Sequence, residues 1–288
     1  MYLLLRAITL FPKCVNQFTN RIIIHKFFLY FHFSNCLMNI SIIGTGNCAT
    51  VLARLSKQKG HQIRQIIGRD ISAAKALAAE LDSGYADIKD APDKNVDLVI
   101  FAISDSSLTD ALKGISFGST PVVHTAGAVS MEALQTVSEN YGVLYPLQSL
   151  GKNMREIPPI PFIIEGNNEA MLDLVKRFAF SLSDSVQEMS CDKRLRLHAA
   201  AVIVNNFTNY IYGVAQNFCN EENVDFHMLL PLIKETAERI QNHSAAEVQT
   251  GPAIRKDITT LDKHLRLLTT HPKLRTMYLR LSDGIMNP

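Results

Sequence analysis

The sequence predicts an α/β protein in which a doubly wound parallel sheet is followed by an all-helical C-terminal domain. Three observations predict this fold. An apolar run meets a glycine turn and a helical segment at 38–56, short apolar runs then alternate with helical patterns, and no convincing strand follows residue 190. With 288 residues, of which 47% are apolar, the chain can form two domains, expected at 38–189 and 190–288.

The segment 38–56, MNISIIGTGNCATVLARLS, is typical of a strand, a tight turn and a helix. Its glycines fit G-x-G-x-x-A, the dinucleotide fingerprint of the Rossmann fold. The first glycine makes the turn, the second lets the backbone approach a pyrophosphate, and the small third residue lets helix and strand pack closely. We therefore expect cofactor contacts from Gly44, Thr45, Gly46, Asn47 and Ala49.

The turn after the predicted second strand, 62–67, decides which dinucleotide is preferred. Arg69 stands where a cation can bind the 2′-phosphate of NADP, and Ser72 begins the next predicted helix, 71–81, where a hydroxyl and free N–H groups can add to that contact. We favour NADP. Asp70 leaves NAD open, because a carboxylate in this turn would bind the ribose hydroxyls instead.

Further strands are predicted at 85–86, 97–103, 121–125 and 142–145, with helices at 108–113 and 131–139. Ligands of doubly wound sheets bind outside the carboxyl ends of the strands. We expect Ser104 to contact the cofactor there, and we expect a substrate to contact Thr125, Gly127, Tyr145 and Gln148. Helix capping by Ser104 and Thr125, and a plain loop position for Gln148, remain equally open.

After the proline-rich segment 151–161, two short strands and a helix complete the first domain. The strands, 162–165 and 185–189, are expected at the sheet edge around a helix at 169–182. Helices then follow at 191–220, 225–241, 244–249, 258–270 and 273–286.

The long helix 191–220 carries polar side chains along one face. His198, Asn205 and Asn209 share a stripe at helical spacing within the apolar run AAAVIVNNF. Polar groups on such a helix need partners, which a ligand pocket or backbone carbonyls can provide. A helix of nearly 30 residues with an apolar body also needs a covering surface, so we expect a homodimer through this domain.

Residues 1–37 differ in composition from the rest of the chain. They contain six Phe, four basic residues and no acidic one, and charges interrupt every apolar run before it reaches the length of a membrane span. Met38 stands directly before a complete first strand, so we interpret 1–37 as a non-native or disordered extension. A peripheral membrane anchor is the alternative.

Charge and cysteine content exclude several classes of function. From Met38 onward the chain has 25 basic and 27 acidic residues and no basic stripe, which argues against nucleic acid. Five scattered cysteines show neither a disulfide framework nor metal-ligand spacing, so we expect reduced thiols in the cytoplasm and no metal site.

The assembled motifs resemble the family in which a Rossmann-like NAD(P)-binding domain precedes a domain of unknown function 2520. The resemblance covers the chain from Met38 to Pro288 and rests on these segments: IIGTGNCA, FAISDSSL, VVHTAGAVS, YPLQSL, LHAAAVIVNNF and TGPAIRKD. The last segment holds Arg255 and Asp257, which the resemblance suggests as substrate residues. The family often has His where this chain has Tyr145, and Gly where it has Lys256.

More distantly, the layout is similar to pyrroline-5-carboxylate reductase, ketopantoate reductase and the 6-phosphogluconate dehydrogenase-like superfamily. In hydroxyacid dehydrogenase relatives a Lys and an Asn on the interdomain helix act at the reacting oxygen, and this chain offers His198 and Asn205 in that place. The resemblance implies a reductase, in which we expect His198 to donate the proton in place of Lys and Asn205 to orient the reacting group. As our own hypothesis, we expect NADP-dependent reduction of a carbonyl or imine of a small, anionic metabolite. A non-catalytic NADP sensor or scaffold, and a purely structural dimerisation protein, are the alternatives.

Overall fold

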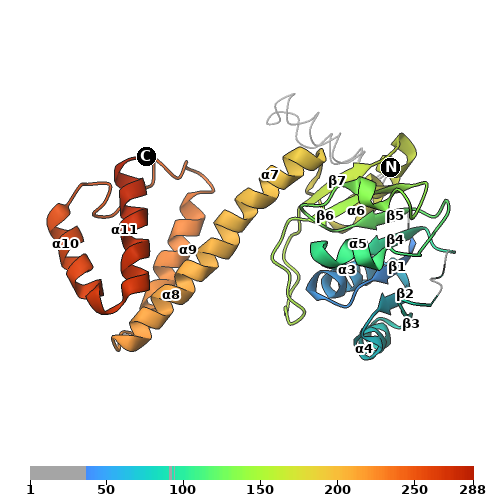
Figure 1. Ribbon diagram of the computed structural model, residues 1–288, viewed down its shortest axis with the longest axis horizontal. Helices are drawn as coiled ribbons and strands as arrows, with labels where there is room; N and C mark the ends of the chain where they lie inside the picture. Colours follow the sequence, from blue (N-terminus) through green and yellow to red (C-terminus); the bar gives the residue numbers. More distant parts are fainter. Residues whose placement is uncertain (1–36, 91–92, 94) are drawn as a thin grey trace, which may run out of the picture. The chain divides into compact units, whose positions relative to one another are not determined.

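The computed structural model describes residues 37–90, 93 and 95–288, which form two compact units. The first unit ends at Ala201 and the second comprises Val202–Pro288 (Figure 1). Our interpretation of 1–37 falls, apart from Leu37, outside the described residues. The domain boundary expected at residue 190 stays a prediction.

The first unit is built on one eight-stranded sheet in the order β3-β2-β1-β4-β5-β6-β7-β8. Its strands are β1 (Asn39–Ile43), β2 (Gln62–Gly68), β3 (Gly84–Asp87), β4 (Leu98–Phe101), β5 (Val122–His124), β6 (Tyr141–Pro146), β7 (Phe162–Gly166) and β8 (Val186–Glu188). All neighbours pair in parallel except β6 and β7, which are antiparallel. Because β1 lies between β2 and β4, the chain reverses its winding there, and the carboxyl ends of these strands open a crevice.

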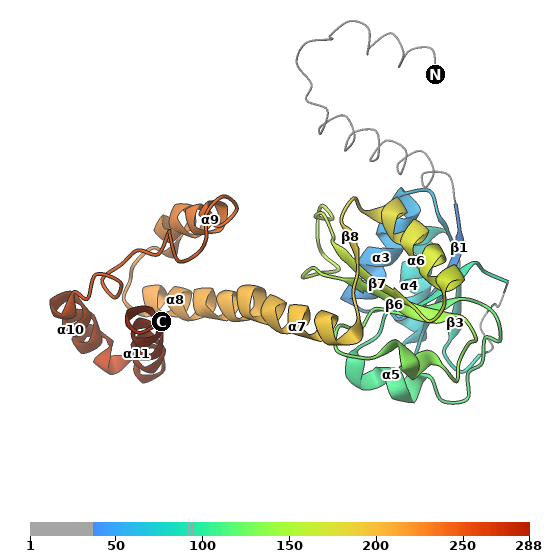
Figure 2. The same cartoon turned by 90° about the horizontal axis from the view of Figure 1, so that it is seen from above.

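Helices cover both faces of this sheet because its strands are apolar on both sides. Alternate residues of one strand enter different clusters: Ile42 packs with α3 (Asn47–Gln58), α4 (Ile71–Leu81) and α6 (Glu169–Leu182), whereas Ile43 packs with α5 (Asp105–Ala111). Figure 2 shows α6 and α5 on opposite sides of the sheet. The prediction of a doubly wound sheet is confirmed.

The predicted helix 131–139 is wrong beyond its first turn. Only the 3₁₀-helix η1 (Met131–Leu134) forms. The hydroxyl of Ser138 donates to the carbonyl oxygen of Thr120 at 2.7 Å and has those of Gly118 and Asn140 nearby at 3.1 Å, and such side-chain bonds compete with helix continuation.

The predicted helix 244–249 is also wrong, because this segment forms turns only. Ser244 and Glu247 bond to each other in the manner of a helix start, but Gly251 and Pro252 follow within a few residues. These two residues therefore end the helical turn before it can extend into a helix.

The predicted long helix forms with a change of winding at its middle. It consists of α7 (Cys191–Ala201), the π-helix η2 (Val202–Phe207) and α8 (Thr208–Glu221). The hydroxyl of Thr208 donates to the carbonyl of Ile203, five residues earlier, at 3.4 Å, which fits the wider turn.

The second unit is helical and has little core of its own. After α8 come η3 (Phe226–Leu229), α9 (Leu230–Arg239), α10 (Ile258–Leu267), η4 (Leu268–Thr270) and α11 (Pro272–Met286). Within Val202–Pro288 the buried residues are Cys219, Ala253, Leu261 and Leu268. In the described part of the chain no helix is long and apolar enough to cross a membrane.

His124, the last residue of β5, is fully buried, and its ring forms hydrogen bonds to the loop that follows. The backbone N–H of Ala126 donates to its Nδ1 at 3.2 Å, so Nε2 carries the ring proton and donates to the carbonyl of Ser130 at 3.2 Å. Burial lowers the pKa of His124 to about 4.

We predict that His124 makes the fold sensitive to acid. The unfolded chain binds a proton at this ring below pH of about 6.5, whereas the folded chain binds it only near pH 4, so stability falls between these values. His124 should account for about 2 to 3 kcal/mol of lost unfolding free energy between pH 7 and 4.5. Urea unfolding of wild type and His124→Gln at both pH values measures this, and an equal pH dependence in the two proteins contradicts the assignment.

Candidate active site

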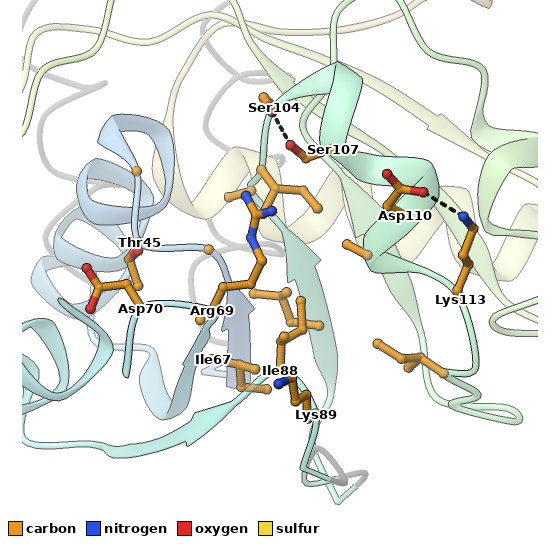
Figure 3. A pocket seen from close by; sticks show the side chains of 18 of the residues that line it. Thr45, Ile67, Arg69, Asp70, Ile88, Lys89, Ser104, Ser107, Asp110 and Lys113 are labelled. Atoms are coloured by element: carbon orange, nitrogen blue, oxygen red, sulfur yellow. Dashed lines mark hydrogen bonds and ion pairs between the residues drawn. The ribbon is translucent and has the colours of Figure 1, made fainter. Parts of the chain in front are cut away.

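A cavity of about 1120 Å³ lies at the carboxyl ends of β1, β2, β3 and β4 (Figure 3). The predicted cofactor residues that line it are Gly44, Thr45, Gly46, Asn47, Arg69 and Ser104. Ala49 instead lies fully buried in the helix–sheet interface, as the small third position of the fingerprint requires. Six of the eight predicted cofactor positions therefore surround one cavity.

Gly44 is the residue that lets β1 turn beside β4. Its φ is +134°, and a Cβ there would lie 2.2 Å from the carbonyl oxygen of Ala102. Any side chain would force the two strand ends apart, so the turn needs glycine. Gly46, by contrast, has nothing within 4 Å of its Cβ direction, which leaves its side of the turn open to a ligand.

The N-terminus of α3 is available to an anion. Gly46 is its N-cap, no side chain of the described residues caps it, and the first helical bond runs from the N–H of Thr50 to the carbonyl of Gly46 at 3.0 Å. The N–H groups of Asn47, Cys48 and Ala49 precede that bond, with the positive end of the helix dipole behind them. This uncapped helix start beside an open glycine fits a dinucleotide pyrophosphate.

The N-terminus of α4 is already occupied by its own cap. Oδ1 of Asp70 accepts from the N–H groups of Ser72 and Ala73, both at 3.0 Å. Ser72 is not among the residues lining the cavity, and its N–H is not free for phosphate. The structure thus does not bring Ser72 to the position expected for it.

Arg69 presents a cation to the cavity. Figure 3 shows its side chain extending inward, whereas that of Asp70 turns toward Thr45. Lys89 and Lys113 also line the cavity, although Lys113 is paired with Asp110 at 2.7 Å. Asp70 also lines the cavity, but its Oδ1 caps α4, so Arg69 is the group of this turn that could bind a phosphate.

Tyr145 and His198 form a hydrogen-bonded pair. The phenol oxygen of Tyr145, on β6, lies 2.9 Å from Nδ1 of His198, on α7. Gly127 lies against both rings, because a Cβ there would lie 2.7 Å from that Nδ1. Burial first, and the carboxylate of Asp105 second, raise the pKa of Tyr145, so the phenol keeps its proton at neutral pH.

This pair can hold and pass a proton. In the neutral tautomer that carries its proton on Nε2, the phenol donates to Nδ1. When the imidazole is protonated, Nδ1 donates to the phenol oxygen, and the proton of the phenol is then free for a third group. Tyr145 and His198 can thus act as one donor unit, whereas the sequence pointed to His198 as the proton donor and to Tyr145 as a substrate contact.

The remaining predicted substrate residues occupy separate positions. The hydroxyl of Thr125 is buried, donates to the carbonyl of Phe101 at 3.4 Å and accepts from Sγ of Cys48 at 3.6 Å. Gln148 is exposed and its amide bonds within its own loop.

In the second unit, Asn205, Asn209 and Arg255 are exposed, whereas Asp257 caps α10 through the N–H of Thr260 at 3.0 Å. Among the described residues, no group of three or more potential metal ligands occurs.

Arg194 is a buried residue that the sequence analysis missed. It lies one helical turn before His198, has no exposed surface, and forms an ion pair with Glu165 of β7. In the sequence DKRLRLH, Arg194 and the exposed Arg196 look alike. The only signal that distinguishes Arg194 is its four-residue spacing to His198, which puts both on one helix face.

Comparison with known proteins assigns both parts of the chain. Residues 39–126 match the family described as NADP oxidoreductase coenzyme F420-dependent, and residues 160–285 match domain of unknown function 2520. A crystal structure of a candidate NADP oxidoreductase from Bacteroides fragilis is 33% identical, with a TM-score of 0.80 over 89% of this chain and 100% of that one. This chain belongs to the DUF2520 family of NADP oxidoreductases. The predictions of the family, of an oxidoreductase and of NADP as cofactor are confirmed.

Two further solved structures share the fold of this DUF2520 oxidoreductase. A Thermotoga maritima protein is 20% identical, with a TM-score of 0.68 over 85% of this chain and 99% of that one. A 1-pyrroline-5-carboxylate reductase from Streptococcus pyogenes is 18% identical, with a TM-score of 0.59 over 88% and 99%. A search of curated proteins finds no match.

One family feature agrees with the geometry of the second unit. Lys256 has a φ of +55°, in the left-handed region that favours glycine. The glycine that the resemblance places at this position would adopt this backbone conformation without strain.

We predict that Arg69 gives this DUF2520 oxidoreductase its preference for NADP. Removing a charge-assisted phosphate contact should cost roughly 1.5 to 3 kcal/mol, so Arg69→Ala should weaken NADP binding at least about ten-fold and leave NAD binding unchanged. Isothermal titration of both cofactors measures this. Arg64→Ala, an exposed arginine of β2 outside the cavity lining, is the control. Equal affinities of the wild type for NADP and NAD would contradict the assignment.

Proposed function

We propose that this oxidoreductase reduces a carbonyl or imine of a small, anionic metabolite, with Tyr145 and His198 supplying the proton. The observation that carries the proposal is the 2.9 Å contact between the phenol and Nδ1 of His198. NADPH, when bound in the cavity, supplies the hydride.

The proton-donating pair meets the chemical requirement of such a reduction. Adding hydride to a carbonyl or imine carbon leaves the oxygen or nitrogen short of a proton, and a positioned acid lowers the barrier for providing it. The raised pKa of Tyr145 keeps the phenol protonated, and His198 returns a proton to it through Nδ1.

For the cofactor we propose the residues around the cavity. The N–H groups that open α3 would hold the pyrophosphate, and Arg69 would hold the 2′-phosphate. Gly127, which lies against the His198 ring, is the further substrate contact that we propose within the first unit.

We also propose that the protein is a cytoplasmic homodimer. The free thiols of Cys48, Cys191 and Cys219 are compatible with a reducing compartment. The second unit exposes many large apolar side chains, more than an isolated domain usually leaves in water: Ile203, Val204, Phe207, Tyr210, Met228, Leu232, Ile240, Ile258, Leu267 and Leu281. A second copy of the chain would cover them.

The dimer is tested by mass in solution. Light scattering of the full chain at micromolar concentration should give twice the monomer mass, and Val204→Asp with Phe207→Asp should shift it toward the monomer because charges oppose burial. Gln216→Asp, an exposed position on α8, controls for the added charge. A wild-type monomer would exclude the dimer.

The reductase activity is tested by a metabolite screen that follows NADPH absorbance. On the substrate found, His198→Gln and Tyr145→Phe should each lower kcat about a hundred-fold or more and leave the Kd for NADPH within two-fold, because the general acid is lost while the cofactor contacts remain. His243→Gln, exposed in the second unit, is the matched control.

Two outcomes would contradict the proposal. NADPH binding without turnover of any small carbonyl or imine would favour a cofactor sensor. Full activity in a stable His198→Gln variant would remove the pair from the mechanism, so the melting temperature is measured on the same preparations.

A further inference from the structure

Arg194 combines complete burial with a full charge. Its side chain has no exposed surface, and among the described residues it is the only Arg, Lys, Asp or Glu in the buried class. Removing a guanidinium from water is costly unless every part of it is paired. Its partners therefore indicate what the residue does.

Those partners come from two different segments of the first unit. Nε donates to the carbonyl of Gly127 at 3.2 Å and one terminal nitrogen donates to the carbonyl of Val129, both in the loop after β5. The other terminal nitrogen forms the ion pair with Glu165 of β7, whose side chain is 11% exposed. The planar guanidinium thus joins α7 to the loop and to the sheet.

The same segments carry the Tyr145–His198 pair. His198 follows Arg194 by one turn of α7, so both side chains project from the same face. Gly127, whose carbonyl Arg194 holds, lies against the His198 ring. Tyr145 is on β6, next to the strand that carries Glu165, where Val143 is the direct partner of Glu165.

We propose that Arg194, with Glu165, is a positioning residue that sets the His198 ring against Tyr145. It acts through the Gly127 carbonyl and the anchored turn of α7, and it contacts neither substrate nor cofactor itself. The inference rests on the proposed function, because positioning matters to catalysis only if the pair donates a proton.

The planar set of N–H donors in the Arg194 guanidinium, and not its charge alone, holds the loop after β5 and the strand β7. A lysine would keep the charge but could not hold two carbonyls and a carboxylate in one plane. Arg194→Lys should therefore keep the fold and loosen the His198 ring. Glu165→Gln should also loosen the ring, because a neutral amide accepts from the guanidinium more weakly than a carboxylate does.

The test is ¹⁵N NMR of the imidazole nitrogens in the full chain with labelled histidine, with His198 assigned from the His198→Gln spectrum. At pH 8 the wild type should show one tautomer, with the proton on Nε2 and Nδ1 accepting. Arg194→Lys and Glu165→Gln should show averaging between tautomers, as Tyr145→Phe should. Arg196→Lys, an exposed arginine of α7, should match the wild type.

Binding and activity separate this role from a structural one. The Kd for NADP should stay within two-fold in both variants, while kcat on the substrate found falls at least ten-fold with KM unchanged. Wild-type ring signals in a folded Arg194→Lys protein overturn the proposal, as does failure of both variants to fold, which makes Arg194 a structural residue. A wild type with one fixed tautomer but no reductase activity refutes the proposed function alone.

Discussion

The close approach of β1 to the end of β4 is the constraint on which the site depends. With the Ala102 carbonyl 2.2 Å from where a Cβ would be, residue 44 must be glycine, and only then can β1 turn directly into α3. This turn brings the start of α3 to the mouth of the crevice, where parallel strands end together. The cavity, its open glycine and its helix N-terminus all follow from this contact.

Capping decides which of two helix starts can bind phosphate. Asp70 satisfies the first N–H groups of α4, whereas α3 begins with glycine and keeps its N–H groups available. Asp70, the carboxylate that could have bound the ribose hydroxyls of NAD, therefore caps α4 instead. Arg69, one residue earlier, lines the cavity and is the residue that we propose for the 2′-phosphate of NADP.

Local patterns predicted much of the fold and part of the site. The fingerprint, the buried strands and the helices α4 and α6 depend on periodicity and turn residues within short segments, and the structure confirms them. The helix predicted at 131–139 failed because Ser138 bonds to carbonyls across the loop, which no local pattern contains.

Contacts distant in sequence could not be predicted in this way. Tyr145 and His198 are 53 residues apart, and their contact depends on where α7 leaves the sheet. Arg194 and Arg196 are equivalent in a charged helical stretch until the fold buries one and exposes the other. Sequence periodicity marks a helix face, but only packing decides what that face meets.

The central claim is that the bare start of α3 holds the pyrophosphate of NADP. Residue-resolved amide hydrogen exchange with and without NADP tests it most directly, since the two helix starts serve as site and control. We expect new protection at Asn47, Cys48 and Ala49, and no change at Ser72 and Ala73, whose N–H groups Asp70 already holds. Protection at Ser72 and Ala73 without protection at the start of α3 would contradict it.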